Sequence, residues 1–473
     1  MRIRAVVFLI FCLSTVSLAT EPKTMRLDYY HTGNTTQEFY SVDRVVIEPL
    51  AWPGHPKNNI DEGVLGKYRF EIADKKSGKL IFARGFDSIY GEWVTTAEAK
   101  TANRTFHESL RFPTPDAPVE ITLRKRDAHN KWQKAWNLTL DPKDMFVDPA
   151  LPPSPGELIE IVKNGPSSDK VDVLIIGDGY TQKERGKFEA DAKRMIKHLF
   201  AASPFKERAT DFNVWGLCPP AAESGVSRPS TGIHRASPLG TSYDIFRIER
   251  YALTFDNKSF RNFASFAPYE FVEILMNGQT YGGGGIFGLY STVAVDNTWA
   301  PYVFVHEFGH HFVGLADEYY TSDVAYLPPA FKVEPWEPNV TALLDPKTLK
   351  WKDLVSADTP LPTPWNKDEY EDMSRGYQRR RKEIRKDQKP ETEMDQLAKK
   401  NRRSEESLLR EEKYAGKVGA FEGANYATKG YYRPEANCIM FTKTDFFCSV
   451  CKRALTKQID FYSRSGKQEE KSK

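Results

Sequence analysis

The stretch HEFGHHFVGLADEYY, residues 306–320, concentrates side chains that can bind a metal ion and move a proton. His306 and His310 are four residues apart, so on a helix they lie on one face, one turn from each other. Two imidazoles placed in this way can both reach one zinc ion at about 2.1 Å. Glu307 is one step round the helix, where its carboxylate can act as general base toward a water molecule. The spacing predicts a helix that carries a hydrolytic zinc site.

A third ligand is expected just after this helix. Gly314 can end the helix in the left-handed conformation, and Asp317 returns a carboxylate three residues later. Asp317 is therefore the expected third ligand, and Glu318 is its competitor. His311 points about 100° away from His310 on a helix, so we expect it to support the site or to lie at the surface.

Several neighbouring residues favour a helix at this place and a partner segment beneath it. Thr298 can cap the helix, Pro301 suits an early helical position, and Phe308 and Phe312 contribute to an apolar side. Far downstream, Asn437-Cys438-Ile439-Met440 can form a turn that places Met440 under the metal. The order of helix, glycine turn, third ligand and methionine turn resembles the metzincin arrangement.

The chain around this site is that of an exported protein with little preference for nucleic acid. Its 473 residues carry 67 basic and 64 acidic side chains, and this near balance gives no argument for a nucleic-acid partner. Residues 1–19 combine a basic start, a short apolar run and small residues before Thr20, which predicts a signal peptide; an uncleaved anchor is the alternative. No later run is apolar enough to span a membrane. We expect a secreted, periplasmic or cell-surface protein without a transmembrane segment once the signal is removed.

Four cysteines remain after that segment, namely Cys218, Cys438, Cys448 and Cys451. An even number in an exported chain fits two disulfides, with three possible connectivities. Cys448 and Cys451 form a single CxxC motif with no second pair, so a zinc site made of cysteines alone is the weaker interpretation. The disulfide interpretation is favoured.

The sequence divides into a β-rich part and a mixed part. Residues 20–148 show short alternating runs separated by turn clusters, which predict an all-β, sandwich-like domain. A proline-rich linker at 149–157 precedes a catalytic α/β (α+β) domain at 158–460, in which strands are expected in VDVLIIGDGYT, DFNVWGL, FVEILMNG and IFGLYSTVAV. Gly282 to Gly285 are expected to form a flexible approach to a strand near the cleft. The charged segment 366–413 is expected to be a helical or disordered insertion, and 461–473 a charged tail.

A resemblance extends over nearly the whole mature chain. HEFGHHFVGLADEY, VLIIGDGYT, YGGGG, GAFEGANYATKGYYRPEANCIM and FCSVC resemble the IgA-peptidase family of zinc metallopeptidases, metallopeptidase family sixty-four, which is metzincin-like. The N-terminal YYHTGNTTQEFYSVDRVVIEPLAWPG resembles the β-rich domain that precedes the catalytic domain in that family. The resemblance implies a metal-dependent endopeptidase with His306, His310 and a nearby acid on one catalytic zinc ion, and Glu307 as catalyst. It does not imply that the substrate is IgA, because specificity depends on cleft walls that motifs do not encode.

The expected function is that of a secreted zinc endopeptidase that cuts protein or peptide substrates bound along the edge strand IFGLYSTV. Many metzincins have a tyrosine two residues after the methionine to stabilise the oxyanion. Thr442 stands here, and Tyr319 and Tyr320 are near in sequence without a firm claim to the role. The rival interpretations are a surface-binding protein with a vestigial zinc domain and a zinc amidase that acts on cell-wall peptides. The sequence gives no indication of oligomeric state.

Overall fold

The computed structural model describes residues 22–63, 65–327 and 331–463. The expected signal peptide at 1–19 and most of the expected tail at 461–473 lie outside the described residues. No helix in the described part of the chain has the length and apolar character needed to cross a membrane.

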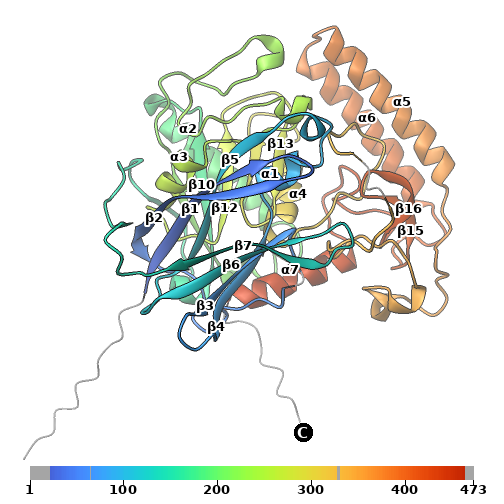
Figure 1. Ribbon diagram of the computed structural model, residues 1–473. Helices are drawn as coiled ribbons and strands as arrows, with labels where there is room; N and C mark the ends of the chain where they lie inside the picture. The colour runs from blue at the N-terminus through green and yellow to red at the C-terminus, as the bar shows by residue number, and fades with distance from the viewer. Residues whose placement is uncertain (1–21, 64, 328–330, 464–473) are drawn as a thin grey trace, which may run out of the picture.

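The N-terminal part is a β-sandwich, as the alternating runs predict (Figure 1). One sheet has the order β5-β1-β2-β8 and the other the order β4-β3-β6-β7. Their strands are β1 (Lys23–Gly33), β2 (Glu38–Ala51), β3 (Tyr68–Asp74), β4 (Leu80–Phe86), β5 (Arg104–Pro113), β6 (Val119–Arg126), β7 (Trp132–Leu140) and β8 (Val147–Asp148). In β6, Val119, Ile121 and Leu123 alternate with half-buried residues and enter the core between the sheets. Helix α1 (Ile89–Trp93) connects β4 to β5.

A six-stranded mixed sheet forms the centre of the second part, with the order β13-β14-β12-β10-β11-β9. The strands are β9 (Ile159–Val162), β10 (Val171–Asp178), β11 (Phe212–Leu217), β12 (Phe271–Met276), β13 (Gly283–Ile286) and β14 (Tyr290–Ala294). The four inner strands are parallel, whereas β9 and β13 run antiparallel to their neighbours. Every residue of β10 is buried because both faces of the sheet are covered. This mixed α/β arrangement after a β-rich domain confirms the predicted fold class.

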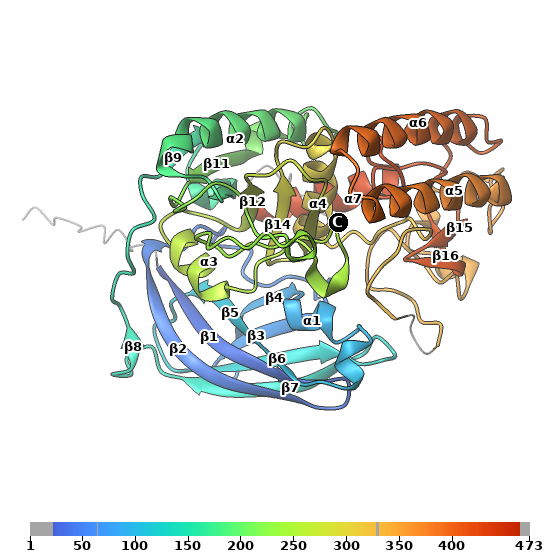
Figure 2. The same ribbon diagram turned by 90° about the horizontal axis from the view of Figure 1, so that it is seen from above.

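Helices cover the two faces of this sheet unequally. Helices α2 (Arg185–Leu199), α4 (Ala300–Val313) and α7 (Ser449–Tyr462) share one core with the side of β10 that carries Val171, Val173 and Ile175. Helix α3 (Asn257–Ala264) packs on the opposite side together with α1. Figure 2 shows α3 between the sandwich and the central sheet.

The prediction of a single strand over IFGLYSTVAV is wrong, because this stretch contains the end of one strand and the start of the next. The chain turns at Phe287–Leu289, so Ile286 ends β13 and Tyr290 begins β14. Gly288 has a φ of 68° in this turn, a conformation that glycine adopts without strain. The edge strand of the sheet is therefore the glycine-rich β13, and Gly283 to Gly285 belong to it.

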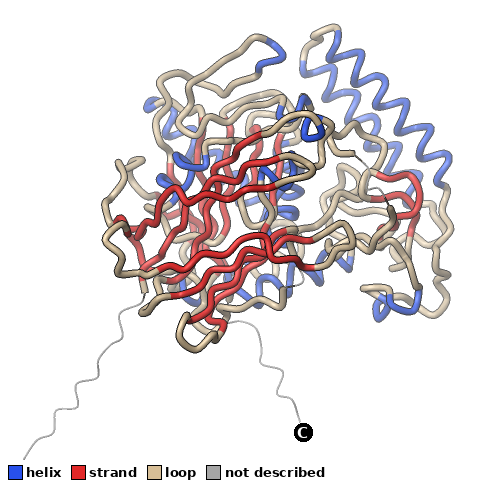
Figure 3. The backbone as a smooth tube through the Cα atoms, viewed as in Figure 1, coloured by secondary structure: helices blue, strands red, loops and turns tan. Residues whose placement is uncertain are grey.

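The charged segment 366–413 is an ordered helical hairpin. Helices α5 (Lys367–Lys386) and α6 (Glu391–Arg410) pack against each other and stand beside the central sheet, as the paired blue helices of Figure 3 show. A two-stranded sheet of β15 (Phe421–Ala424) and β16 (Ala427–Arg433) follows. Short 3₁₀ helices connect the larger elements at η1 (Glu98–Lys100), η2 (Ser167–Asp169), η3 (Gln182–Glu184), η4 (Ala209–Asp211), η5 (Pro229–Thr231), η6 (Ile245–Arg247), η7 (Pro346–Thr348) and η8 (Lys352–Leu354).

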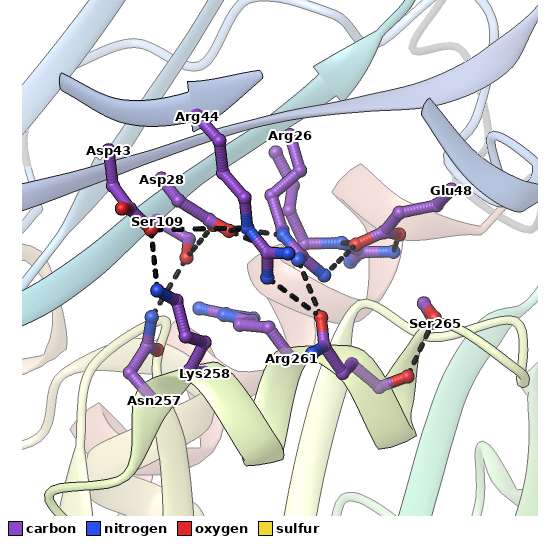
Figure 4. Close-up of polar contacts among 12 residues, drawn as sticks. Arg26, Asp28, Asp43, Arg44, Glu48, Ser109, Asn257, Lys258, Arg261 and Ser265 are labelled. Carbon is purple, nitrogen blue, oxygen red and sulfur yellow. Dashed lines mark hydrogen bonds and ion pairs between the residues drawn. The ribbon is translucent and has the colours of Figure 1, made fainter. Parts of the chain in front are cut away.

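A buried polar cluster joins the sandwich to α3 (Figure 4). Arg26 of β1 donates from Nε to Asp28 Oδ1 at 2.9 Å and from Nη2 to Asn262 Oδ1 at 2.8 Å. Arg44 of β2 donates to the same two partners, to Asp28 Oδ2 at 2.9 Å and to Asn262 Oδ1 at 3.0 Å. Asn262 belongs to α3, so these contacts hold the sandwich against the central sheet.

Candidate metal centre

Helix α4 carries the HEFGHH motif and has well-defined ends. Pro301 occupies its first turn, and Gly314 ends it with φ 62° and ψ 41°, the left-handed conformation expected. The expected cap by Thr298 is wrong, because its hydroxyl donates to Asp395 of α6 at 2.6 Å. Asn297 instead accepts a hydrogen bond from the backbone N–H of Trp299 at 2.9 Å.

Three side chains converge at the C-terminal half of α4. The Nε2 atoms of His306 and His310 are 3.1 Å apart, and Asp317 Oδ1 lies 3.0 Å from the first and 3.2 Å from the second. Four ligands at about 2.1 Å from a tetrahedral zinc would be about 3.4 Å from one another. Asp317 Oδ1 is buried and has no hydrogen-bond partner among the described residues, although both imidazole Nε2 atoms lie close to it. This donor set fits a divalent metal ion.

The two histidines are fixed by contacts on their outer ring atoms. His306 Nδ1 is 2.9 Å from the backbone carbonyl oxygen of Ile439, and His310 Nδ1 contacts the carbonyl oxygen of Leu315. Each Nδ1–H donates to its carbonyl, so each Nε2 is left with a lone pair directed at the common point. Ligand orientation of this kind is typical of metal centres.

Asp317 is held by a residue that sequence reasoning missed. Tyr426, in the turn between β15 and β16, donates its hydroxyl to Asp317 Oδ2 at 2.6 Å. Burial raises the pKa of Asp317, but His310 and His306 outweigh it, and the pKa stays well below its usual range. Asp317 is therefore an oriented carboxylate. The only signal for Tyr426 in the sequence is its place in the stretch GANYATKG, which is part of the family resemblance.

Glu307 lies next to the histidines and lines the cleft. Burial raises its pKa, while His306 and His310 oppose the shift. A raised pKa makes a carboxylate a better proton acceptor near neutral pH. Strand β13 runs directly beside it, since a Cβ on Gly285 would lie 2.4 Å from the backbone oxygen of Glu307. The glycines of β13 thus allow strand and helix to approach, which differs from the flexible segment expected.

The cleft above these residues has a volume of about 680 Å³ and walls from three parts of the chain. Lys67 and Glu92 belong to the sandwich part, and Tyr319 follows α4. Tyr377 and Glu405 belong to the α5–α6 hairpin. The walls could not be predicted from the sequence, because they come from segments hundreds of residues apart.

The expected methionine turn lies beneath α4. Met440 is fully buried, and its Sδ would be 3.3 Å from a Cβ on Gly309. Of the two tyrosines left open, Tyr319 is stacked at 6.4 Å from the ring of His306, whereas Tyr320 is stacked against Phe441 in the core. Tyr319 is the one that lies at the metal centre.

His311 is neither a ligand nor a surface residue. It is fully buried, its Nε2 accepts from the N–H of Val272 at 3.0 Å, and its Nδ1 donates to the carbonyl of Ile286 at 3.1 Å. Burial lowers the pKa of His311 to about 3. It is a neutral side chain that connects α4 to β12 and to the end of β13.

The structure does not contain the two disulfides expected among Cys218, Cys438, Cys448 and Cys451. Cys438, Cys448 and Cys451 instead converge on Glu318, which faces away from the histidines. The structure thus places Asp317 beside His306 and His310, and Glu318 beside the cysteines.

The comparisons with known proteins agree with this geometry. A family profile described as IgA Peptidase M64 matches residues 159–459, and one described as Peptidase M64 N-terminus matches residues 17–137. No curated protein matches the sequence. Among solved structures, the crystal structure of metalloproteinase-II from Bacteroides fragilis is similar over 49% of this chain and 83% of that one, with 12% identity and a TM-score of 0.20, too low to carry an argument. Because the first profile covers well over half of the sequence, the chain belongs to the IgA peptidase M64 family.

Proposed function

We propose that this chain is a secreted zinc-dependent endopeptidase. The observation that carries the proposal is the buried triangle of His306, His310 and Asp317 at the floor of a cleft, with Glu307 beside it. Membership of a peptidase family supports the same conclusion. Export is inferred from the N-terminal residues 1–19, whose composition is that of a signal peptide.

Zinc is the metal that this donor set suits best. Two imidazole nitrogens and one carboxylate oxygen are a ligand set of catalytic zinc sites, which keep further positions open for water and substrate. When bound, zinc supplies a Lewis acid that polarises the scissile carbonyl and makes water more acidic. His306, His310 and Asp317 would hold the ion, while Tyr426 keeps the Asp317 carboxylate in place.

Glu307 is the proposed general base. Its carboxylate accepts a proton from the attacking water and returns it to the amine of the leaving peptide, so that the bond breaks without releasing a strong base. Burial supports the first half of this cycle, because it raises the proton affinity of Glu307. The two neighbouring imidazoles oppose the rise in the pKa of Glu307.

The substrate is proposed to add to β13 as an extended strand. β13 is the edge of the sheet, and both Gly283 and Gly285 line the cleft. The edge at Gly283 is already paired, because Gly283 N–H donates to the carbonyl of Arg250 at 3.1 Å and its carbonyl accepts from Ala252 at 3.1 Å. Gly285 is next to Glu307 and His310, so a peptide paired there would pass the metal centre.

The test is cleavage of a peptide library by the purified mature chain, before and after removal of metal with a chelator. We expect cleavage that stops on chelation and returns with Zn²⁺. Glu307→Gln should keep the metal and lose hydrolysis by orders of magnitude, whereas Glu160→Gln, at the exposed residue of β9, should behave as the wild type. A Glu307→Gln variant that still cleaves would refute the mechanism. Binding without cleavage would favour a surface-binding protein, and cleavage of cell-wall peptides alone would favour an amidase.

A further inference from the structure

A second group of metal-binding side chains lies buried behind the first. It consists of Glu318, Cys438, Cys448 and Cys451, whose ligand atoms all lie within 4.8 Å of one another. None of the four residues is more than 1% exposed. Cys438 Sγ is 3.9 Å from Cys451 Sγ, which is 3.6 Å from Glu318 Oε1. No step of the proposed reaction uses these residues.

The distances fit a tetrahedral zinc ion. With Zn–S bonds of about 2.3 Å and Zn–O bonds of about 2.0 Å, two sulfurs of a regular tetrahedron are about 3.8 Å apart, and a sulfur and an oxygen about 3.5 Å apart. The separations between Cys438, Cys451 and Glu318 are within about 0.1 Å of these values. Three cysteines and a fourth protein donor would fill all four positions around the ion, as in structural zinc sites.

Glu318 also lacks the partners that a buried carboxylate needs. Its Oε1 accepts from Asn339 Nδ2 at 2.9 Å, but Oε2 has no hydrogen-bond partner among the described residues. An unpaired carboxylate oxygen in a protein core is unfavourable, because it loses its hydration and gains no partner. A cation between Glu318 and the three thiolates would remove this cost.

The backbone around the cysteines is arranged for negatively charged sulfur. Cys448 N–H donates to Cys438 Sγ at 3.2 Å, and Cys451 N–H donates to Cys448 Sγ at 3.4 Å. Cys448 is the N-cap of α7, a helix of 14 residues, so the positive end of the helix dipole faces the sulfurs. Contacts of this type surround metal-bound thiolates and tune their affinity.

Disulfide formation explains the cluster less well. Bonded sulfurs are about 2.05 Å apart, whereas Cys438 and Cys451 are separated by 3.9 Å. Any one disulfide among three cysteines would leave out the third cysteine and leave Glu318 Oε2 buried without a hydrogen-bond partner among the described residues. A metal ion uses all four groups at once.

We propose that Glu318, Cys438, Cys448 and Cys451 bind a second, structural zinc ion. This ion would join the segment after α4, the turn that contains Met440 and the start of α7. The Glu318 N–H already donates to the Met440 carbonyl at 2.8 Å across this junction. Asp317 precedes Glu318, and Ile439, whose carbonyl holds His306, follows Cys438. The site would therefore position the ligands of the cleft metal without touching the substrate.

The test is the metal content and X-ray absorption spectrum of the purified full-length mature chain. We expect two zinc ions per chain in the wild type. The double variant His306→Ala/His310→Ala should keep one, with sulfur neighbours at about 2.3 Å. Cys448→Ser/Cys451→Ser should lose that ion, and Cys218→Ser, which changes the cysteine outside the cluster, should retain both.

The double histidine variant keeps the proposal testable even if the cysteine variants do not fold. Zinc without sulfur neighbours in that variant, or a disulfide among the three cysteines found by mass spectrometry of the alkylated chain, would overturn it. The inference is independent of the proposed function: a chain without peptidase activity that holds sulfur-bound zinc refutes only the function. An active chain whose single zinc has no sulfur neighbour refutes only the second site.

Discussion

At the scale of single residues, the metal centre depends on contacts made behind its ligands. His306, His310 and Asp317 each have an outer atom held by a carbonyl or a hydroxyl, which fixes the direction of the inner atom. Two of these contacts come from Ile439 and Tyr426, more than 100 residues after the helix. The motif supplies the ligands, and distant segments supply their orientation.

Tyr426→Phe tests this arrangement by removing only the hydroxyl that donates to Asp317. Without it the carboxylate can rotate, and we expect zinc affinity at the cleft site to fall about 10- to 100-fold. Competition with a chromophoric chelator measures the change. Tyr432→Phe, on the neighbouring strand β16, is the matched control and should leave the affinity unchanged. Equal affinities for wild type and Tyr426→Phe would show that the contact does not orient the ligand.

From the sequence, His306, Glu307 and His310 are expected at the site, with Asp317 favoured over Glu318 as the third ligand. The i, i+4 histidines, Glu307 and the left-handed Gly314 follow from helix geometry, which is local. Asp317 and Glu318 are adjacent carboxylates, and the sequence favours Asp317 by its place three residues after Gly314. Their roles separate only because the chain after Gly314 points one toward the histidines and the other toward Cys451. That direction is set by tertiary contacts, which local patterns do not contain.

At the scale of elements, the approach of β13 to α4 determines the shape of the cleft floor. Gly285→Ala would place a Cβ 2.4 Å from the backbone oxygen of Glu307, so strand or helix must move. We expect a loss of stability of about 1–3 kcal/mol and a clear fall in peptidase activity, measured by urea unfolding and peptide hydrolysis. Gly186→Ala, on α2, meets open space and should be neutral or slightly stabilising. Equal behaviour of the two variants would contradict close packing at Gly285.

The stability of the fold should depend on pH through one buried carboxyl group of the α5–α6 hairpin, that of Glu405. Burial raises the pKa of Glu405 to about 7. Between about pH 4.5 and 7 the folded chain holds a proton that the unfolded chain has released, so stability falls as pH rises through this window. Glu405→Gln removes the effect. The variant should be more stable than the wild type at about pH 8, by up to about 3 kcal/mol, and similar near pH 4.

Urea unfolding of both chains at the two pH values checks this prediction. The control is Glu393→Gln on the same helix, whose side chain is 43% exposed and which should change stability little at either pH. A stability difference between wild type and Glu405→Gln that does not grow with pH would show that Glu405 is ionised in the fold.

Some elements were predictable and others were not, for physical reasons. The buried run of β10 and the amphipathic α2 are recognisable locally, because burial on two faces or on one stripe leaves a pattern. IFGLYSTVAV has no such pattern, since both arms of its hairpin are buried and only Gly288 indicates the turn. The hairpin of α5 and α6 is rich in charges, and its few buried apolar side chains, such as Tyr370 and Leu409, pack into the core shared by α4 and α7.

At the scale of the whole molecule, the sandwich and the catalytic part are joined through buried charge. Asp28 of β1 is fully buried and accepts hydrogen bonds from Arg26, Arg44 and Ser109 (Figure 4). Both arginines also reach Asn262 of α3. The sandwich lines the cleft through Lys67 and Glu92, so its attachment bears on the site as well as on the fold.

Asp28→Asn keeps the shape of this residue and removes the buried charge that Arg26 and Arg44 share, although Arg26 keeps its contact with Glu48 at 3.3 Å. Breaking one member of a buried ion pair costs about 3–5 kcal/mol, and the loss falls on the attachment of the sandwich. We expect differential scanning calorimetry to show the sandwich unfolding before the catalytic part, in place of one joint transition. Glu160→Gln, in an exposed pair with Lys163, should leave the transition unchanged because such pairs contribute little. A joint transition at the wild-type temperature in Asp28→Asn would mean that apolar contacts alone hold the two parts together.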